Sequence, residues 1–330
     1  MKIAVYSDIP LDGRAGGGGI YIKSVSDELR RLGHSVSIND GFNRPRLFSN
    51  HYAVEMCKDA DVHFFNEPST VFPLSLAQSS KPINRVITFH APVAGLVFKN
   101  FYSSVIRLFY RKANLVLATT KRSEQFLKSY GVNATVVPLW ADDFFKSSIQ
   151  NRYARKPYVL SVCLVDRFHT YKNYPMISRL AKTLRSKFNL PLLHVGSNDF
   201  VLPYVTHLGK VSRSELRQLY QNALLLVLPS TGVFEGFGIV AAEALTCNTP
   251  VLVSDCSGIS EFLDDCFVSS LANFENKLTS MIRELIQSNR SIIDKAFSES
   301  LKFSFSNCTR TANMIINCTE KSLGHTFASN

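Results

Sequence analysis

Short apolar runs alternate with amphipathic stretches along most of the chain. The apolar runs have the length and continuity of strands that are buried on both faces of a sheet. They cover residues 2–6, 35–38, 62–65, 85–89, 115–119 and 134–138 in the first half, and 158–162, 192–196, 224–229 and 251–254 in the second. Between them apolar residues recur with the helical period, for instance over 20–32, 176–188, 214–222 and 274–286. This alternation predicts parallel sheets covered by helices.

The pattern stops near residue 140 and restarts near residue 157. The stretch between is polar and basic, and we interpret it as an interdomain linker. A chain of 330 residues is long for one core and natural for two domains. We therefore expect an α/β protein with two Rossmann-like, doubly wound domains, 1–150 and 151–302. Ligands of such sheets bind beyond the carboxyl ends of the strands, so we expect the site in a cleft between the facing domains.

Composition describes an ordinary globular protein. Hydrophobic residues make up 45% of the chain, and no apolar run approaches the roughly 20 residues of a membrane-spanning helix. The start of the chain lacks the features of a signal peptide. The seven cysteines are irregularly spaced and suggest reduced thiols. We expect a cytoplasmic protein.

Positive charge is concentrated between residues 81 and 128. This segment holds nine Lys and Arg residues and a single acid, Glu124, in a chain whose net charge is +11. Such a patch indicates an anionic partner, which can be a nucleic acid, an anionic membrane or a phosphorylated substrate.

Three loops after predicted strands carry candidate chemistry. Gly16–Gly19 opens a helix, where free N–H groups can receive an anion, although the spacing matches neither GxGxxG nor a P-loop. His90 ends an apolar strand. Arg167 and Lys172 follow the first strand of the second domain and would suit a diphosphate. The alternative for the glycines is a flexible loop. The alternative for His90 is a structural role, and the alternative for Arg167 and Lys172 is that their charges are solvated.

A fourth loop places two carboxylates around a glycine turn. Glu235 precedes Gly236-Phe237-Gly238, and Glu243 lies in the first turns of the helix that begins near Ile239. Main-chain N–H groups at the turn can hold a phosphate while the carboxylates accept hydroxyl groups. This combination favours a nucleotide sugar over the acid pair of a glycosidase, which is the rival interpretation. The Asp-Ala-Asp sequence at 59–61 has the DxD pattern of a metal site but precedes a strand instead of following one. No zinc spacing occurs, and we expect no metal.

Together these motifs resemble the retaining glycosyltransferases of family 4, which have the GT-B fold. The stretch "EGFGIVAAEAL" resembles that family's E-x7-E element, and "DRFHTYKN" its R-x4-K element. The segments "GGGGIYIKSVSDELRRLGHSV", "VITFHAP" and "GKVSRSELRQLYQNALLLVLPS" are also similar. Residues 303–330 begin with a helix similar to the one that crosses back to the N-terminal domain. Asn248 stands where the family usually has glycine.

The resemblance implies a metal-independent, retaining transfer of a hexose-type sugar from a UDP- or GDP-linked donor, with no cofactor. The resemblance assigns catalytic roles to His90, Arg167, Lys172 and Glu235. It assigns donor binding to Arg167, Lys172, Glu235 and Glu243, and to the main chain at Gly16, Gly17, Gly236, Phe237, Gly238 and Ile239. Glu243 would hold the ribose, Glu235 the sugar, and Arg167 and Lys172 the diphosphate.

The acceptor implied is a glycan or lipid-linked sugar in the synthesis of a surface polysaccharide or glycolipid. Residues 97–112 then have a functional interpretation as a basic amphipathic helix that docks on the anionic inner face of the plasma membrane. The alternative is a helix packed on the sheet with a solvated basic face. No nucleic-acid module is visible, so nucleic acid is not expected as a partner. A non-catalytic module that binds a nucleotide sugar or an anionic lipid is the second hypothesis for the whole chain.

Overall fold

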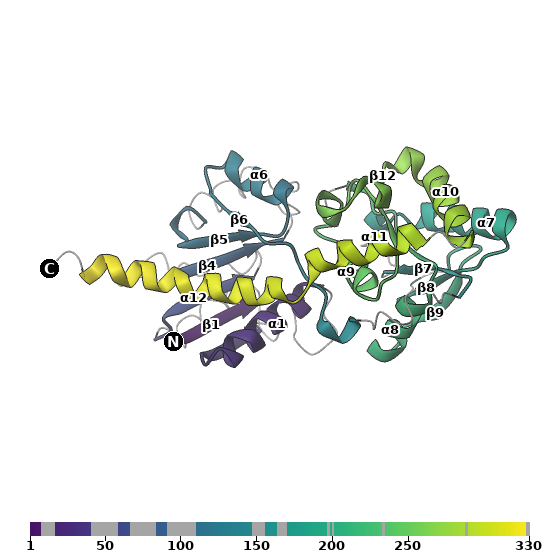
Figure 1. The fold of residues 1–330 in the computed structure, drawn as a ribbon. Helices are drawn as coiled ribbons and strands as arrows, with labels where there is room; N and C mark the ends of the chain where they lie inside the picture. Colours follow the sequence, from purple (N-terminus) through teal and green to yellow (C-terminus); the bar gives the residue numbers. More distant parts are fainter. Residues whose placement is uncertain are drawn as a thin grey trace. The chain divides into compact units, whose positions relative to one another are not determined.

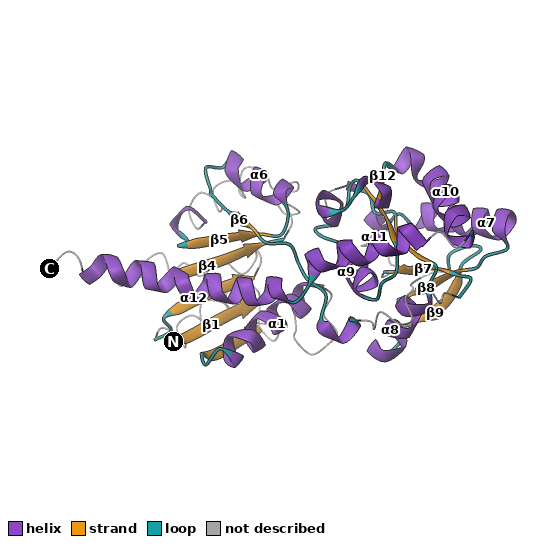
Figure 2. Cartoon of the chain, in the orientation of Figure 1, coloured by secondary structure: helices purple, strands orange, loops and turns teal. Residues whose placement is uncertain are grey.

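The computed structural model divides into two compact units (Figure 1). It describes residues 1–7, 17–40, 59–66, 84–90, 110–146, 156–163, 170–196, 199, 201–232, 235–287 and 290–327. Unit 1 comprises residues 1–139 and 306–330, and unit 2 comprises residues 140–305. Each unit is built around its own parallel sheet (Figure 2).

The sheet of unit 1 has six strands in the order β2-β1-β3-β4-β5-β6. All neighbouring strands pair in parallel. The strands are β1 (Lys2–Ser7), β2 (Ser35–Asp40), β3 (Val62–Asn66), β4 (Asn84–Phe89), β5 (Leu115–Ala118) and β6 (Thr135–Val136). The central strands β1 and β3 are buried almost throughout, because helices or loops cover both faces of the sheet.

Helices α1 (Gly17–Arg31) and α12 (Ser306–Phe327) lie side by side in unit 1 (Figure 1). One stripe of α1, which includes Ile22, Val25 and Leu29, is fully buried. Thr309 Oγ1 donates to Glu28 Oε1 at 2.8 Å and links the two helices. The described part of unit 1 also contains the short helix η2 (Tyr110–Lys112) and α6 (Lys121–Ser129). No described helix, α12 included, is both long and apolar enough to cross a membrane.

The sheet of unit 2 has the order β12-β11-β10-β7-β8-β9 and is also parallel. Its strands are β7 (Val159–Val162), β8 (Leu192–Val195), β9 (Thr206–Gly209), β10 (Leu225–Leu228), β11 (Val251–Ser254) and β12 (Val268–Ser269). Its helices are α7 (Tyr174–Phe188), α8 (Arg213–Asn222), α9 (Ile239–Thr246), α10 (Phe274–Ile286) and α11 (Arg290–Ser300). Single-turn helices η3 (Asp143–Phe145), η5 (Thr170–Lys172), η7 (Gly258–Phe262), η8 (Asp265–Phe267), η9 (Leu271–Asn273) and η10 (Leu301–Phe303) connect them.

Local sequence fixes several helix ends in unit 2. Ser212 forms a capping box with Glu215 at the start of α8. Asn248, the residue that replaces a glycine common in the family, has a φ of +61°. Asparagine tolerates this left-handed conformation better than most residues do. The turn from α9 into β11 therefore does not require glycine.

The predicted fold class is confirmed, because both units contain the parallel sheets that the apolar runs indicate. Every predicted strand is present within a few residues. The edge strands β9 and β12 and the helices α6 and α11 were not predicted. Strand β9 has an alternating exposed and half-buried pattern. Helix α6 buries only Ser123 and Leu127, so it has no broad apolar stripe.

Part of the stretch interpreted as linker packs inside unit 2. Phe145 is buried and lies edge-on to the ring of Tyr220 at 5.7 Å between centroids. Arg213 bonds to Asp142 at 2.9 Å, and its guanidinium lies over the ring of Phe144. Phe144 and Phe145, which lie in an otherwise polar stretch, thus anchor the start of that stretch to unit 2.

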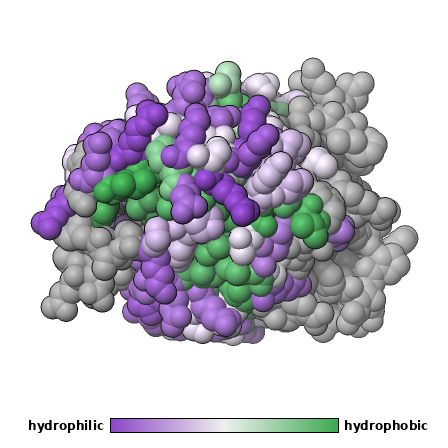
Figure 3. Space-filling model, turned by 90° about the vertical axis from the view of Figure 1, so that its right-hand side faces the viewer, coloured by the Kyte–Doolittle hydropathy of each residue, from purple (hydrophilic) through white to green (hydrophobic). Residues whose placement is uncertain are grey.

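The surface of the molecule viewed at the end where α7 and α10 lie shows apolar patches among hydrophilic side chains (Figure 3). Within unit 2 the exposed apolar residues include Val201, at 79%, and Tyr204, at 55%. Lys182 Nζ lies 5.8 Å from the centre of the Tyr204 ring, so a cation partly covers that ring.

Candidate active site

The loops that follow β7 and β10 bring together a buried ion pair. These two strands are neighbours in the sheet, so the segments after their carboxyl ends lie close together. Lys172 closes η5, and Glu235 follows β10. Lys172 Nζ donates to Glu235 Oε2 at 2.5 Å, and the two side chains are only 14% and 9% exposed. Two residues that the sequence analysis assigned to the donor site are therefore in direct contact.

Hydrogen bonds to main-chain carbonyl groups tie the same two loops to each other. The N–H and the hydroxyl of Thr231 both donate to the carbonyl of Tyr171, at 2.6 and 3.2 Å. Asn173 Nδ2 donates to the carbonyl of Pro229 at 3.0 Å. These bonds hold the loops at a fixed spacing, so the ion pair rests on a rigid support.

Ser230 orients the Glu235 carboxylate and was not singled out from the sequence. Its hydroxyl donates to Glu235 Oε2 at 2.8 Å, and its own carbonyl accepts from Ser254 Oγ at 2.6 Å. Both serines are fully buried. Because Oε2 receives Lys172 and Ser230, the carboxylate can present Oε1 to a hydroxyl group of a ligand. The sequence signal was a hydroxyl side chain directly after the apolar strand.

The electrostatic environment keeps Lys172 charged. Burial alone would lower the pKa of its ammonium group, but the Glu235 carboxylate beside it outweighs burial and the pKa lies above the usual value. The same surroundings act on Tyr171, whose pKa is raised mainly by burial. The loop after β7 therefore carries a permanent buried cation.

The glycine turn after Glu235 has a shape that only glycine accommodates. Gly238 has a φ of +98° and precedes the first residue of α9. A Cβ at this position would lie 2.8 Å from Leu228 Cδ2. The N–H of Ile259 donates to the carbonyl of Phe237 at 2.6 Å, and the Phe237 ring is buried. The N–H of Ala241 donates to the Gly238 carbonyl at 3.0 Å, and the amino end of a helix such as α9 suits an anion.

Glu243 lies one turn into α9 and is buried, at 5% exposure. Tyr220 Oη donates to Glu243 Oε2 at 3.0 Å. Burial raises the pKa of this carboxyl to about 7, against the opposing effects of Tyr220 and Arg213. Tyr220 was also not singled out from the sequence, because a tyrosine at the end of an amphipathic helix is typical of a core residue.

His90 lies in unit 1, directly after β4, and is buried. Its Nε2 is 2.8 Å from Asn66 Oδ1, and its ring lies edge-on to the ring of Tyr21. An amide oxygen only accepts, so Nε2 carries the proton and Nδ1 is left as an acceptor. Burial lowers the pKa of His90 to about 4, which keeps the imidazole neutral at pH 7. The His90 carbonyl accepts from Thr119 Oγ1 at 3.1 Å, which anchors the turn.

Several predicted residues lie outside the described part of the chain. They are Arg167, Gly16 and residues 97–109 of the basic amphipathic stretch. Gly17 is the first residue of α1, as expected for a glycine loop that opens a helix. At the end of the basic stretch, Tyr110 belongs to the core of unit 1, together with Phe89 and Leu127.

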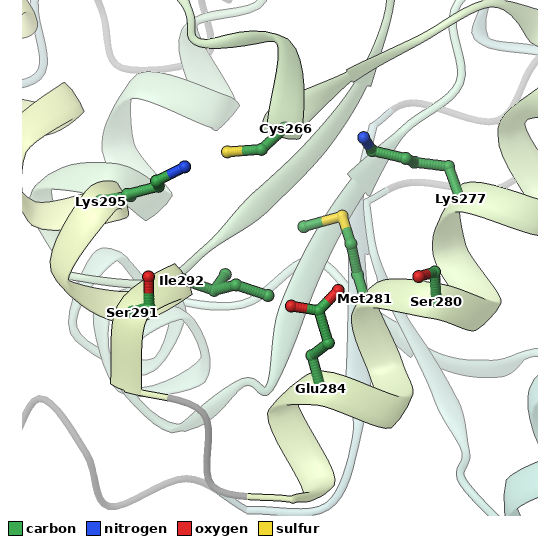
Figure 4. Close-up of a pocket in the computed structure, with 8 residues that line it drawn as sticks. All are labelled: Cys266, Lys277, Ser280, Met281, Glu284, Ser291, Ile292 and Lys295. Atoms are coloured by element: carbon green, nitrogen blue, oxygen red, sulfur yellow. The ribbon is translucent and has the colours of Figure 1, made fainter.

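A separate cavity of about 140 Å³ opens between α10, α11 and η8 (Figure 4). The Lys295 ammonium and the Cys266 thiol point toward each other there, and Met281 and Ile292 form its apolar side (Figure 4). Burial, together with the Asp264 carboxylate, raises the pKa of Cys266 to about 12, so this thiol is not a reactive one. No residue that was predicted for the donor site lines this cavity. Among the described residues no three His, Cys, Asp or Glu side chains are grouped to hold a metal ion.

Comparison of the sequence identifies a matching family model and several relatives. Residues 145–296 match the family model described as Glycosyl transferases group 1. The O-antigen chain mannosyltransferase RfbU of Salmonella typhimurium is 27% identical over 178 residues, which cover 50% of this chain and 49% of that protein. An uncharacterised glycosyltransferase of Methanocaldococcus jannaschii is 34% identical over 114 residues, covering 32% of this chain and 31% of that protein. The chain thus matches about half the length of its curated relatives or less.

Solved structures resemble the chain over nearly its full length. Sucrose-phosphate synthase from Thermosynechococcus elongatus has a TM-score of 0.78 at 16% identity, with 100% of both chains covered. Anabaena HepE in complex with UDP and glucose has a TM-score of 0.75 at 17% identity, over 96% of this chain and 99% of that one. At such identities the similarity establishes the fold. The narrower assignment to family 4 stays a prediction. Residues 145–296 match the model of the group 1 glycosyl transferases, within a chain whose two parallel-sheet units have the GT-B fold.

Proposed function

We propose that the protein is a metal-independent, retaining glycosyltransferase. It transfers a hexose-type sugar from a UDP- or GDP-linked donor to a glycan or lipid-linked acceptor, in the synthesis of a surface polysaccharide or glycolipid. The observation that carries this proposal is the buried contact between Lys172 and Glu235 beside the amino end of α9. A fixed cation, a carboxylate and a helix N-terminus are the groups that a sugar diphosphate requires.

The names of related proteins support the substrate class. RfbU is an O-antigen chain mannosyltransferase, and a relative from Paenarthrobacter aurescens is a D-inositol 3-phosphate glycosyltransferase, 26% identical over 178 residues. HepE, which has a similar fold, has been solved with UDP-glucose. These names agree on a sugar donor and differ in the acceptor, so the acceptor is the less constrained part of the proposal.

In this proposal Lys172 stabilises the departing diphosphate. One N–H of its ammonium is directed to Glu235, and the group has two further donors for phosphate oxygens. Charge gathers on the diphosphate in the transition state, and a cation already held in place lowers the energy of that state. Arg167 is proposed to act on the same diphosphate.

Glu235 is proposed to fix the sugar, with Oε1 accepting from its hydroxyl groups. Ser230 and Lys172 hold the other oxygen, so the carboxylate is oriented before the donor arrives. His90 of unit 1 is proposed to accept a sugar hydroxyl at Nδ1. Glu243 is proposed to bind the ribose hydroxyls.

The transfer itself exchanges one bond for another at the anomeric carbon. The bond from this carbon to the diphosphate oxygen breaks, and a bond to the acceptor oxygen forms on the same face. The acceptor's proton passes to the departing phosphate oxygen. In this scheme no side chain acts as general acid, so both glutamates bind rather than transfer protons.

The test measures release of nucleotide from UDP- and GDP-sugars, with a candidate acceptor and with and without EDTA. E235Q and K172A should lower transfer by roughly a hundredfold or more, as the loss of one transition-state contact typically does. Lys187 is exposed on α7 and provides the matched control, K187A. NMR of the product gives the anomeric configuration.

Three results would count against parts of the proposal. Full activity in both site variants contradicts the site assignment. Loss of activity in EDTA contradicts metal independence, and an inverted product contradicts retention. A wild-type protein that binds nucleotide sugars but transfers nothing to any acceptor favours the binding-module hypothesis instead.

Docking of residues 97–112 on an anionic membrane is a separate part of the proposal. Flotation with vesicles that contain phosphatidylglycerol should recover the protein, and flotation with phosphatidylcholine alone should not. Equal recovery from both contradicts electrostatic docking.

A further inference from the structure

Three contacts hold the side chain of Tyr220 in place, and one of them is the hydrogen bond from its hydroxyl to the Glu243 carboxyl. Its Oη donates to Glu243 Oε2 at 3.0 Å. The Tyr220 carbonyl accepts a hydrogen bond from Thr249 Oγ1, and its ring packs edge-on against Phe145. Tyr220 is fully buried. The ring is therefore fixed at its main chain, on its face and at its hydroxyl.

Packing alone does not account for this hydroxyl. A phenylalanine would fill the same space, and a buried hydroxyl costs free energy unless it is bonded. The partner it finds is a carboxyl that has no bonded cation among the described residues. The guanidinium of Arg213 acts on Glu243 through its charge, and it is itself paired with Asp142 at 2.9 Å.

We infer that Tyr220 is a positioning residue for the nucleotide donor, because its hydroxyl holds Glu243 Oε2 and turns Oε1 toward the donor's hydroxyl groups. This inference rests on the proposed function, in which Glu243 binds ribose. Tyr220 does not itself contact the donor in this scheme. Its effect passes through the orientation and the ionisation of one carboxyl group.

The charged and titratable groups around Glu243 come from several elements packed on α9. Tyr220 and Arg213 belong to α8, and Asp142 precedes η3. On the other side, Glu299 of α11 and Lys302 of η10 are paired with each other at 2.8 Å. Glu261 lies on η7, which also packs on α9. Within this set Tyr220 is the group bonded to the Glu243 carboxyl.

The ionisation of Glu243 makes the inference measurable. Burial raises the pKa of Glu243 to about 7, and the Tyr220 hydrogen bond opposes that rise. Hydroxyl groups donate best to the ionised carboxylate, so donor affinity should increase as the pH rises through about 7. Removal of the Tyr220 hydroxyl raises the pKa of Glu243 further, and the pH curve should move in the alkaline direction.

The experiment compares UDP, GDP and ADP binding by calorimetry between pH 5.5 and 9 for wild type, Y220F and E243Q. For Y220F we expect the midpoint to move upward by about one pH unit, the effect of one hydrogen bond to a charged group. Binding at pH 7 should weaken by about fivefold and recover at pH 9. E243Q should remove the part of the pH dependence that has its midpoint at about pH 7, while the ionisation of the nucleotide's terminal phosphate at about pH 6 should affect all variants alike. Y158F is the matched control, because it removes a hydroxyl of unit 2 that donates to the carbonyl of Leu219.

The outcomes separate this inference from the proposed function. A wild-type protein that binds none of the diphosphates at any pH contradicts the proposed function. A wild-type protein that binds, together with a Y220F curve that overlies the wild-type curve, contradicts the role of Tyr220 alone. A carbon-13 NMR titration of labelled glutamate provides a second readout, because it follows the ionisation of the Glu243 carboxyl directly. If the titration midpoint of Glu243 is the same in Y220F as in wild type, the inference is also contradicted.

Discussion

We predict that replacing either Lys172 or Glu235 lowers both the free energy of unfolding and the transfer activity. Both side chains are buried, at 14% and 9% exposure, and their charges neutralise each other at 2.5 Å. Removal of one partner leaves the other charge buried without compensation, which typically costs about 3–5 kcal/mol. Ser230 still bonds to Glu235 in K172M, so we expect the lower end of that range, about 3 kcal/mol.

E235Q should cost less than K172M. The glutamine carbonyl can still accept a hydrogen bond from Lys172, and we expect a loss of about 2 kcal/mol. The double variant K172M/E235Q contains no buried charge at this site. Its loss should therefore be smaller than the sum of the two single losses by about 2 kcal/mol. In a unit of this size, K172M should lower the melting temperature by about 6–12 °C.

The assay is urea unfolding of the four proteins in a double-mutant cycle, with transfer activity measured on the same samples. The exposed Lys187 again supplies the control, and K187M should change the free energy of unfolding by less than about 0.5 kcal/mol. The double variant should be about as stable as K172M, with a loss of about 3 kcal/mol instead of the additive value of about 5 kcal/mol, and it should stay inactive. Single losses that add within about 0.5 kcal/mol would refute the reasoning, because they would show that the two charges do not interact.

Three further predictions concern the same region. E243Q should be more stable than wild type by about 3 kcal/mol at pH 8 and by less than about 1 kcal/mol at pH 5. The reason is that the pKa of the folded Glu243 carboxyl is raised to about 7, so its contribution to the free energy of unfolding is lost as the pH rises through that value. An equal difference in stability at both pH values in urea unfolding contradicts this prediction. G238A should lose about 2–4 kcal/mol, because its Cβ meets Leu228 Cδ2 at 2.8 Å in a left-handed backbone, and a loss below 0.5 kcal/mol by the same assay would disagree. S230A should reduce kcat by about tenfold by releasing Glu235 Oε2, and an unchanged kcat in the transfer assay would show that the orientation of Glu235 does not need this hydroxyl.

The site could be predicted from the sequence only in part. Lys172, Glu235 and Glu243 were found because their spacing matches a family pattern and because each follows a predicted strand or opens a helix. Ser230 and Tyr220 were not found, since a serine after a strand and a tyrosine in a helix have many structural uses. Their bonds to the two glutamates span 5 and 23 residues and depend on how the loop and α8 fold back on α9.

The sequence by itself determined the fold class of this protein. Continuous apolar runs of strand length can be buried only in sheets covered on both faces, and the helical stretches between them supply the cover. It did not determine β9, β12 or α6, whose residues are too polar or too few to show a clear apolar pattern. Helix α11 was not singled out either, although Ile292, Ile293 and Ala296 are buried at helical spacing. The tertiary structure decided which side chains meet. Lys172 and Glu235 are 63 residues apart, and they contact each other because β7 and β10 are neighbours in the sheet, an arrangement that the local pattern of either strand does not contain.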